Sequence, residues 1–60
     1  MKLRDLEKAL KELGWYLHRE GGKHHIWTNG RKTLSVPRHA EVNEFTARGI
    51  ISDGIKKNKE

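Results

Sequence analysis

The chain has 60 residues and a mass of 7.0 kDa, so we expect one small domain over residues 1–60, with a core drawn from the 33% of residues that are hydrophobic. It contains no cysteine, which excludes disulfide bonds and thiolate zinc sites. Thirteen lysines and arginines against eight acidic residues give a net charge of +5, which favours polyanions, above all nucleic acid, as partners. No apolar run is long enough to cross a bilayer and no leader pattern precedes the first helix, so we expect a cytoplasmic protein without membrane attachment.

The first predicted element is an amphipathic helix from Lys2 to Leu13. Its leucines recur every three or four residues, which places them along one face of a helix: Leu3, Leu6, Leu10 and Leu13. Gly14 ends this helix, because glycine readily adopts the left-handed conformation in which many helices terminate.

A first strand follows directly. Alternation from Trp15 to His18 directs Trp15 and Leu17 to the buried face of a sheet. Tyr16 and His18 then point outward, where the ring of Tyr16 could stack on a nucleic-acid base. The glycine pair at 21–22 ends this strand.

The middle of the chain predicts a β-hairpin. Asn29-Gly30 suits a two-residue type I′ turn, because both central residues of that turn need positive φ. Such a turn sets five cross-strand pairs: Thr28–Arg31, Trp27–Lys32, Ile26–Thr33, His25–Leu34 and His24–Ser35. Because partners share a face, His25 and Trp27 lie on the inner face with the apolar residues of the third strand. His24 then lies on the open face of the sheet.

A second helix is predicted after Pro37, which fits the end of the third strand. Either Asn43 or Thr46 serves as its N-cap. Four apolar residues are expected to pack this helix against the sheet: Phe45, Ile50, Ile51 and Ile55. Gly49 and Gly54 weaken the helix, since each costs about 1 kcal/mol relative to alanine in a helix interior.

The predicted fold class is therefore α+β, with the element order α-β-β-β-α. Two helices would pack on one face of a three-stranded antiparallel sheet and leave the other face open. This arrangement resembles a small double-stranded-RNA-binding domain, although a likeness of fold alone does not establish function.

Four segments carry a family resemblance that covers nearly the whole chain: residues 2–14 followed by Trp15, Gly22–Trp27, Asn29–Arg31 and Val36–His39. The most specific are Gly-Lys-His-His, which begins at residue 22, and Val-Pro-Arg-His, which begins at residue 36. With both motifs at this separation, the chain resembles the HicA toxin family of bacterial and archaeal toxin–antitoxin systems. It departs from the family's pattern at Lys23, where serine is usual, and at residues 44–48, where a Pro-Gly-Thr-Leu-Arg type of segment often begins the second helix.

The resemblance implies a toxin that is an endoribonuclease, an mRNA interferase that cleaves mRNA independently of translation. It also implies a HicB antitoxin as partner, in a hetero-oligomeric complex, and it carries the family's catalytic histidine onto His24. We expect no cofactor. A zinc site built from His24, His25 and His39 is not expected either, because adjacent strand residues point to opposite faces.

One histidine suffices for this chemistry because RNA carries its own nucleophile, the 2′-hydroxyl. Imidazole titrates near neutral pH, so His24 could take the proton of that hydroxyl or protonate the leaving 5′-oxygen. The candidate RNA-binding residues are Lys23, Arg31, Lys32, Arg38, His39 and Tyr16. By this account DNA, which lacks the 2′-hydroxyl, would be bound but not cut.

Each of these features also has a plainer interpretation. His25 is expected to be a buried or half-buried core residue, and His39 could cap the following segment or touch the antitoxin. The alternative function is a non-catalytic basic RNA-binding module, which would bind RNA in a salt-dependent way and leave it intact. A third interpretation is a small adaptor whose open sheet face, around Ile26, serves only a protein partner.

Overall fold

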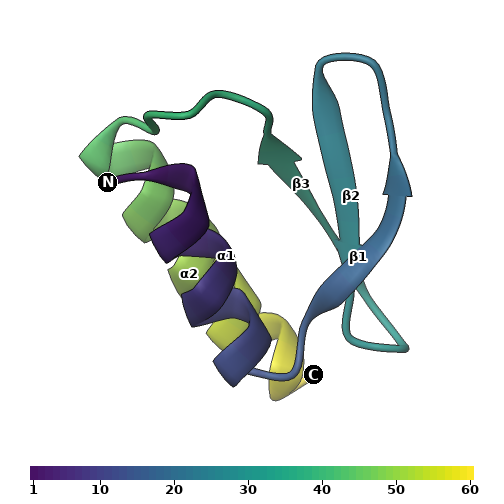
Figure 1. The fold of residues 1–60 in the computed structure, drawn as a ribbon. Helices are drawn as coiled ribbons and strands as arrows, with labels where there is room; N and C mark the ends of the chain where they lie inside the picture. Colours follow the sequence, from purple (N-terminus) through teal and green to yellow (C-terminus); the bar gives the residue numbers. More distant parts are fainter.

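The helix, three strands and helix that the sequence predicts are all present in the computed structural model, which describes residues 1–60 (Figure 1). Their bounds are α1 (Leu3–Glu12), β1 (Tyr16–Glu20), β2 (His24–Thr28), β3 (Thr33–Pro37) and α2 (Glu44–Asn58). The strands form one antiparallel sheet in the order β1-β2-β3, which confirms the α+β class. Neither helix is long and apolar enough to cross a membrane.

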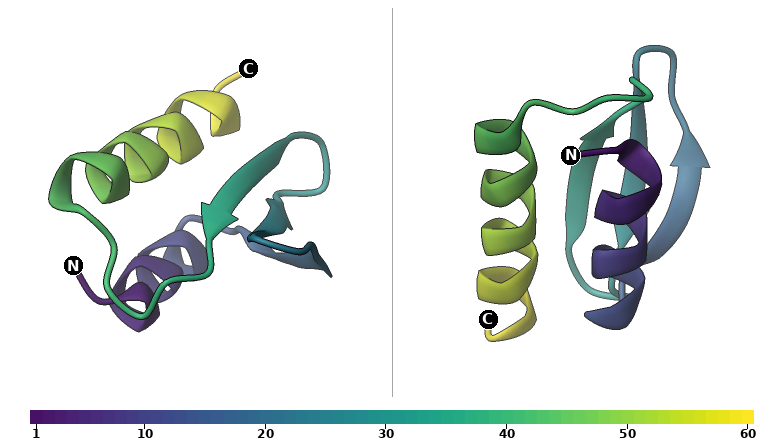
Figure 2. Two further views of the ribbon diagram at one scale, coloured as in Figure 1. Left: turned by 90° about the horizontal axis from the view of Figure 1, so that it is seen from above. Right: turned by 60° about the vertical axis from the view of Figure 1, so that its left-hand side comes forward.

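Both helices cover the same face of the sheet, and no element covers the other face (Figures 1 and 2). Eight buried apolar residues fill the space between the two layers: Leu6, Leu10, Trp15, Trp27, Leu34, Val36, Val42 and Ala47. Three of them come from β2 and β3, where every second side chain points inward. Two more belong to the leucine stripe of α1, so the amphipathic pattern predicted the buried face of this helix correctly.

The connection between β2 and β3 is not the predicted type I′ turn. It is a four-residue loop, residues 29–32, closed by the pair Thr28–Thr33. Asn29 lacks the positive φ that a type I′ turn requires. Its side chain favours the longer loop instead, because Oδ1 accepts from the backbone N–H groups two and three residues further on, at 2.9 and 2.7 Å.

The longer loop moves every predicted pair of this hairpin by two residues. The observed pairs are Trp27–Leu34, Ile26–Ser35, His25–Val36 and His24–Pro37. A shift of two residues preserves the face of each side chain, since alternation along a strand has a period of two. His24 therefore lies on the open face and His25 on the inner face, as the sequence predicts.

β1 is an edge strand and departs from the predicted alternation. Trp15 precedes it and is buried, with Nε1 donating to the Gly54 carbonyl at 3.3 Å. Leu17, expected inside, is 42% exposed, because neither helix packs extensively on this edge. A β-bulge at His18 shifts the register between Leu17 and Arg19. The strand ends at Glu20, directly before the glycine pair that is predicted to end it.

α2 begins at the predicted cap but turns a different side to the core. Asn43 Oδ1 accepts from the Phe45 N–H at 2.8 Å, so Asn43 is the N-cap. Phe45 itself is 88% exposed, and the prediction that it packs in the core is wrong. With Ala47 buried, Phe45 lies about 200° away around the helix axis, at about 100° per residue. Ile55 is also exposed, at 41%, and the buried position beside it is Gly54.

Gly54 is buried because the core packs directly against it. A Cβ there would lie 3.2 Å from Trp15 Nε1 and 3.4 Å from Leu34 Cδ1. The residue that weakens an isolated helix therefore lets α2 approach the sheet closely. Gly49, in contrast, faces open space. Val42, in the segment before α2, is a core residue that no sequence periodicity indicated.

The last turn of α2 is tied to both neighbouring loops by Asn58. Its Oδ1 accepts from Asn29 Nδ2 and its Nδ2 donates to the Leu13 carbonyl, each at 2.8 Å. Lys57 Nζ also donates to the Thr33 carbonyl at 2.8 Å. These bonds hold together the end of the molecule that carries the β2–β3 loop. None of them involves the β1–β2 loop, which lies at the other end of the sheet.

Candidate functional site

A hollow of about 500 Å³ opens where the β1–β2 loop meets the segment after β3. Five residues line it, and none of them is hydrophobic: Gly22, Lys23, His24, Arg38 and His39. Antiparallel pairing creates this neighbourhood, because His24 at the start of β2 lies opposite Pro37 at the end of β3. The pairing thereby brings together the two most specific sequence motifs.

The charge of this hollow is uniformly positive. Lys23 and Arg38 contribute cations, His24 and His39 contribute imidazoles, and no carboxylate lines the hollow. All four residues are exposed. Such a site offers charge and hydrogen-bond donors to a phosphate group, together with titratable groups that can move a proton.

Arg38 connects the two segments that form the hollow. Its Nη1 donates to the Gly22 carbonyl at 2.6 Å and to the Gly21 carbonyl at 3.5 Å. The segment after β3 is thereby joined to the loop that carries Lys23 and leads into His24. A guanidinium has five N–H groups, so Arg38 keeps further donors for a ligand.

Gly21 sets how closely the β1–β2 loop approaches the first residue of β2. A Cβ at this position would lie 2.4 Å from the His24 carbonyl oxygen, closer than real Cβ atoms come to any neighbour. A Cβ on Gly22 would meet nothing within 4 Å. Of the two positions, only residue 21 has no room for a side chain, because the His24 carbonyl oxygen occupies the space that a Cβ would need.

His25 lies on the opposite face from His24. It pairs with Val36, is half-buried, and its Nε2 is buried without a hydrogen-bond partner. This position agrees with its interpretation as a core residue. The two adjacent imidazoles diverge, and the chain contains no group of three histidine, cysteine or acidic side chains that could hold a metal ion.

Two of the candidate RNA-binding residues lie at the other end of β2 from His24. Arg31 and Lys32 belong to the β2–β3 loop, which begins after Thr28, about 13 Å from His24 along the strand at 3.3–3.4 Å per residue. Arg31 Nη2 donates to the Asn58 carbonyl at 3.5 Å, and Lys32 Nζ lies 3.3 Å from a carboxylate oxygen of Glu60. Both side chains therefore also hold the loop to the end of α2.

β1 adds two side chains to the open face of the sheet. Tyr16 pairs with Thr28 and is 53% exposed. Arg19 pairs with Ile26 on the same face, because the bulge at His18 inserts one extra residue. Strict alternation places Arg19 inside, so sequence reasoning missed it. The available signal was that an arginine facing inward conflicts with an apolar core.

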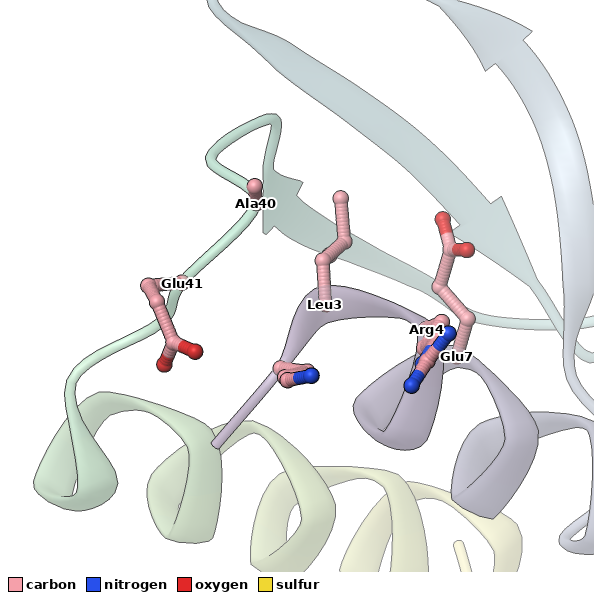
Figure 3. A pocket seen from close by; sticks show the side chains of 6 residues that line it. Leu3, Arg4, Glu7, Ala40 and Glu41 are labelled. Carbon is pink, nitrogen blue, oxygen red and sulfur yellow. The ribbon is translucent and has the colours of Figure 1, made fainter.

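A second hollow, of about 420 Å³, lies between the start of α1 and the segment after β3 (Figure 3). Lys2 and Arg4 line it, but so do Glu7 and Glu41, so charges of both signs face it. None of the candidate site residues reaches this place. It lacks both the uniform positive charge and the imidazoles of the hollow beside His24.

Comparison with known proteins adds one finding to this geometry. The family model of the HicA toxin of bacterial toxin–antitoxin systems matches residues 3–56. The matched span includes both segments that form the hollow beside His24. No match to the chain is found among curated proteins or among solved structures.

Proposed function

This chain belongs to the HicA toxin family of bacterial toxin–antitoxin systems, and from this premise we propose that it is an endoribonuclease that cleaves mRNA and is neutralised by a HicB antitoxin. The family makes it a toxin with an antitoxin as partner. The observation that supports cleavage is the setting of His24. Its imidazole is exposed on the open face of the sheet, in a hollow that contains two cations and no carboxylate.

In the proposed reaction, the 2′-oxygen of a ribose bonds to the adjacent phosphorus while the bond from phosphorus to the 5′-oxygen breaks. His24 takes the proton of the 2′-hydroxyl or gives a proton to the leaving 5′-oxygen, a contribution of about 10²–10⁴-fold to the rate. Lys23 and Arg38 hold the non-bridging oxygens of the phosphate and stabilise the charge that develops on them. His39 contacts the same phosphate or its neighbour.

The open face of the sheet extends the RNA-binding surface away from the hollow. Arg19 and Tyr16 face the same side as His24, and Arg31 and Lys32 stand at the far end of β2. An exposed tyrosine ring can stack on a base, which is worth about 1–3 kcal/mol. Single-stranded RNA is the favoured substrate, since its unpaired bases can reach such a platform.

Inhibition by the HicB antitoxin is proposed to work by masking. A partner that covers the hollow and presents acidic residues to Lys23 and Arg38 would exclude RNA from His24. Toxin and antitoxin then form a hetero-oligomer in which the site is closed. A complex that leaves His24 accessible to RNA would contradict this mode of inhibition.

The test compares the purified protein with His24→Ala and His18→Ala on a labelled single-stranded RNA in EDTA. His18 is the matched control, because it is an exposed histidine of β1 that does not line the hollow. We expect the wild type and His18→Ala to cut the RNA and His24→Ala to leave it intact, with circular dichroism showing all three folded. DNA of the same sequence should bind without being cut.

Two results would contradict this proposal, one for the ribonuclease activity and one for the role of His24. RNA that the wild type binds in a salt-dependent way but never cuts would support the non-catalytic RNA-binding module instead. Cleavage that persists in a folded His24→Ala variant would show that His24 is not the catalytic group.

A further inference from the structure

The hollow beside His24 contains a second imidazole. His39 stands two residues after Pro37, the last residue of β3, and both histidines are exposed to the same space. The other charged groups that face the hollow are Lys23 from the β1–β2 loop and Arg38 from the segment after β3. The two imidazoles are therefore the side chains in this hollow that can act either as a proton acceptor or as a proton donor.

Cleavage of RNA by its own 2′-hydroxyl requires two proton transfers. A base takes the proton of the hydroxyl as its oxygen bonds to phosphorus, and an acid gives a proton to the 5′-oxygen as the second bond breaks. The products are a 2′,3′-cyclic phosphate and a free 5′-hydroxyl. A guanidinium cannot accept the first proton, because it stays protonated in proteins.

We propose that His24 and His39 act as a pair, one as the general base and the other as the general acid of the same cleavage step. The proposal rests on the ribonuclease function proposed above and assigns His39 a catalytic role. After each turnover one imidazole has gained a proton and the other has lost one, and exchange with water restores both. The reaction is thereby balanced without any further group.

Two contacts support this pairing. Arg38, which directly precedes His39, is bonded to the Gly22 carbonyl at 2.6 Å and so fixes the segment after β3 against the loop that leads into His24. His39 has no structural task of its own that the bonds of this fold reveal. The cap of α2, a role that His39 could have filled, belongs to Asn43.

The first measurement is the pH dependence of kcat/KM for RNA cleavage. The wild type should give a bell-shaped profile, with one limb from the base and one from the acid. His24→Gln and His39→Gln should each lower the rate by about 10²–10⁴-fold, and each should lose a different limb. His18→Gln is the control, and it should keep both limbs and the wild-type rate.

The second measurement uses an RNA in which sulfur replaces the scissile 5′-oxygen. A thiolate leaves without being protonated, because thiols are far more acidic than alcohols. The variant that lacks the acid should therefore recover cleavage on this substrate, and the variant that lacks the base should not. Recovery by one of the two variants identifies which histidine is the acid, and a merely structural defect would not be relieved in this way.

Failure of the pairing and failure of the ribonuclease function give different results. If His39→Gln cuts RNA at the wild-type rate while His24→Gln is inactive, the pairing is wrong and the ribonuclease function stands. If His39→Gln is slow on both substrates and keeps both limbs of the pH profile, His39 binds RNA only and the pairing is again wrong. A folded wild type that cuts neither substrate would refute the ribonuclease function itself.

Discussion

Replacing Gly21 by alanine would place a methyl group against the backbone of the site. The new Cβ would start 2.4 Å from the His24 carbonyl oxygen and would need at least 3.0 Å, so the two segments must separate by about 0.6 Å or more. Such a movement would also stretch the hydrogen bond that Arg38 donates to the Gly22 carbonyl. Gly22→Ala is the matched control for stability, since neither glycine has a positive φ and the Gly22 Cβ would meet nothing within 4 Å.

Two opposing effects set the change in stability. Forcing a methyl group into a filled space costs about 1–3 kcal/mol of unfolding free energy. Replacing glycine by alanine restricts the unfolded chain and returns about 0.4–1 kcal/mol. Gly22→Ala experiences only the second effect and should be slightly stabilised. Gly21→Ala experiences both, so we expect a net loss of about 0–2.6 kcal/mol and a stability about 1–3 kcal/mol below that of Gly22→Ala.

The effect of Gly21→Ala on RNA cleavage should be larger than its effect on stability. Misplacing a catalytic group by about 1 Å can cost about 10²-fold in rate, and the displacement here acts directly on His24. Urea unfolding, followed by the fluorescence of the two buried tryptophans, measures the effect on stability. Cleavage of a labelled RNA by the folded variant measures the effect on activity.

A Gly21→Ala variant that is as stable as Gly22→Ala and cuts RNA at the wild-type rate would contradict both expectations. That result would mean that the β1–β2 loop yields freely, and that His24 does not depend on the close approach of Gly21. A Gly21→Ala variant that is destabilised but fully active would place the strain in the loop alone.

Three further predictions concern α2 and its N-cap. Gly49→Ala should stabilise the protein by about 0.5–1 kcal/mol, because its exposed Cβ meets nothing within 4 Å. Gly54→Ala should instead lose up to about 2 kcal/mol, since its Cβ would lie 3.2 Å from Trp15 Nε1, and equal urea midpoints for the two variants would contradict this account. Asn43→Ala removes the acceptor of the Phe45 N–H and should cost about 1 kcal/mol, or about 4–8 °C in Tm, whereas Asn43→Asp should keep the wild-type Tm.

Periodicity predicted the elements and the face of His24, even though the Asn29-Gly30 dipeptide predicted the wrong turn. The register was off by two residues, an even number, so the alternation of β2 around Trp27 still placed each side chain on its observed face. The turn itself depended on a local competition. Asn29 accepts two backbone N–H bonds in the longer loop, and the preference of the Asn-Gly dipeptide for type I′ turns does not reveal this option.

The other errors arise from contacts between elements, which a single strand or helix does not encode. Phe45 is the most hydrophobic residue of the first turn of α2, yet the small residues Ala47 and Gly54 decide which side of the helix meets the core. The bulge at His18 likewise moves Arg19 to the open face, and no glycine or other turn residue in β1 indicates this bulge in the sequence. The motifs that begin at Gly22 and Val36 meet in one hollow because β2 pairs with β3. This proximity could have been predicted from the sequence.

The sheet separates the residues that maintain the fold from those that meet a ligand. Trp27 and Val36 pack against the helices, whereas His24 stands on the uncovered side, so a substitution of His24 removes no contact of the core. Under the proposed masking, a toxin inactivated by a substitution of His24 would still bind an antitoxin molecule. In a cell that makes both forms, the inactive toxin would bind antitoxin that would otherwise neutralise the active toxin. The mutation would therefore harm the cell that carries it.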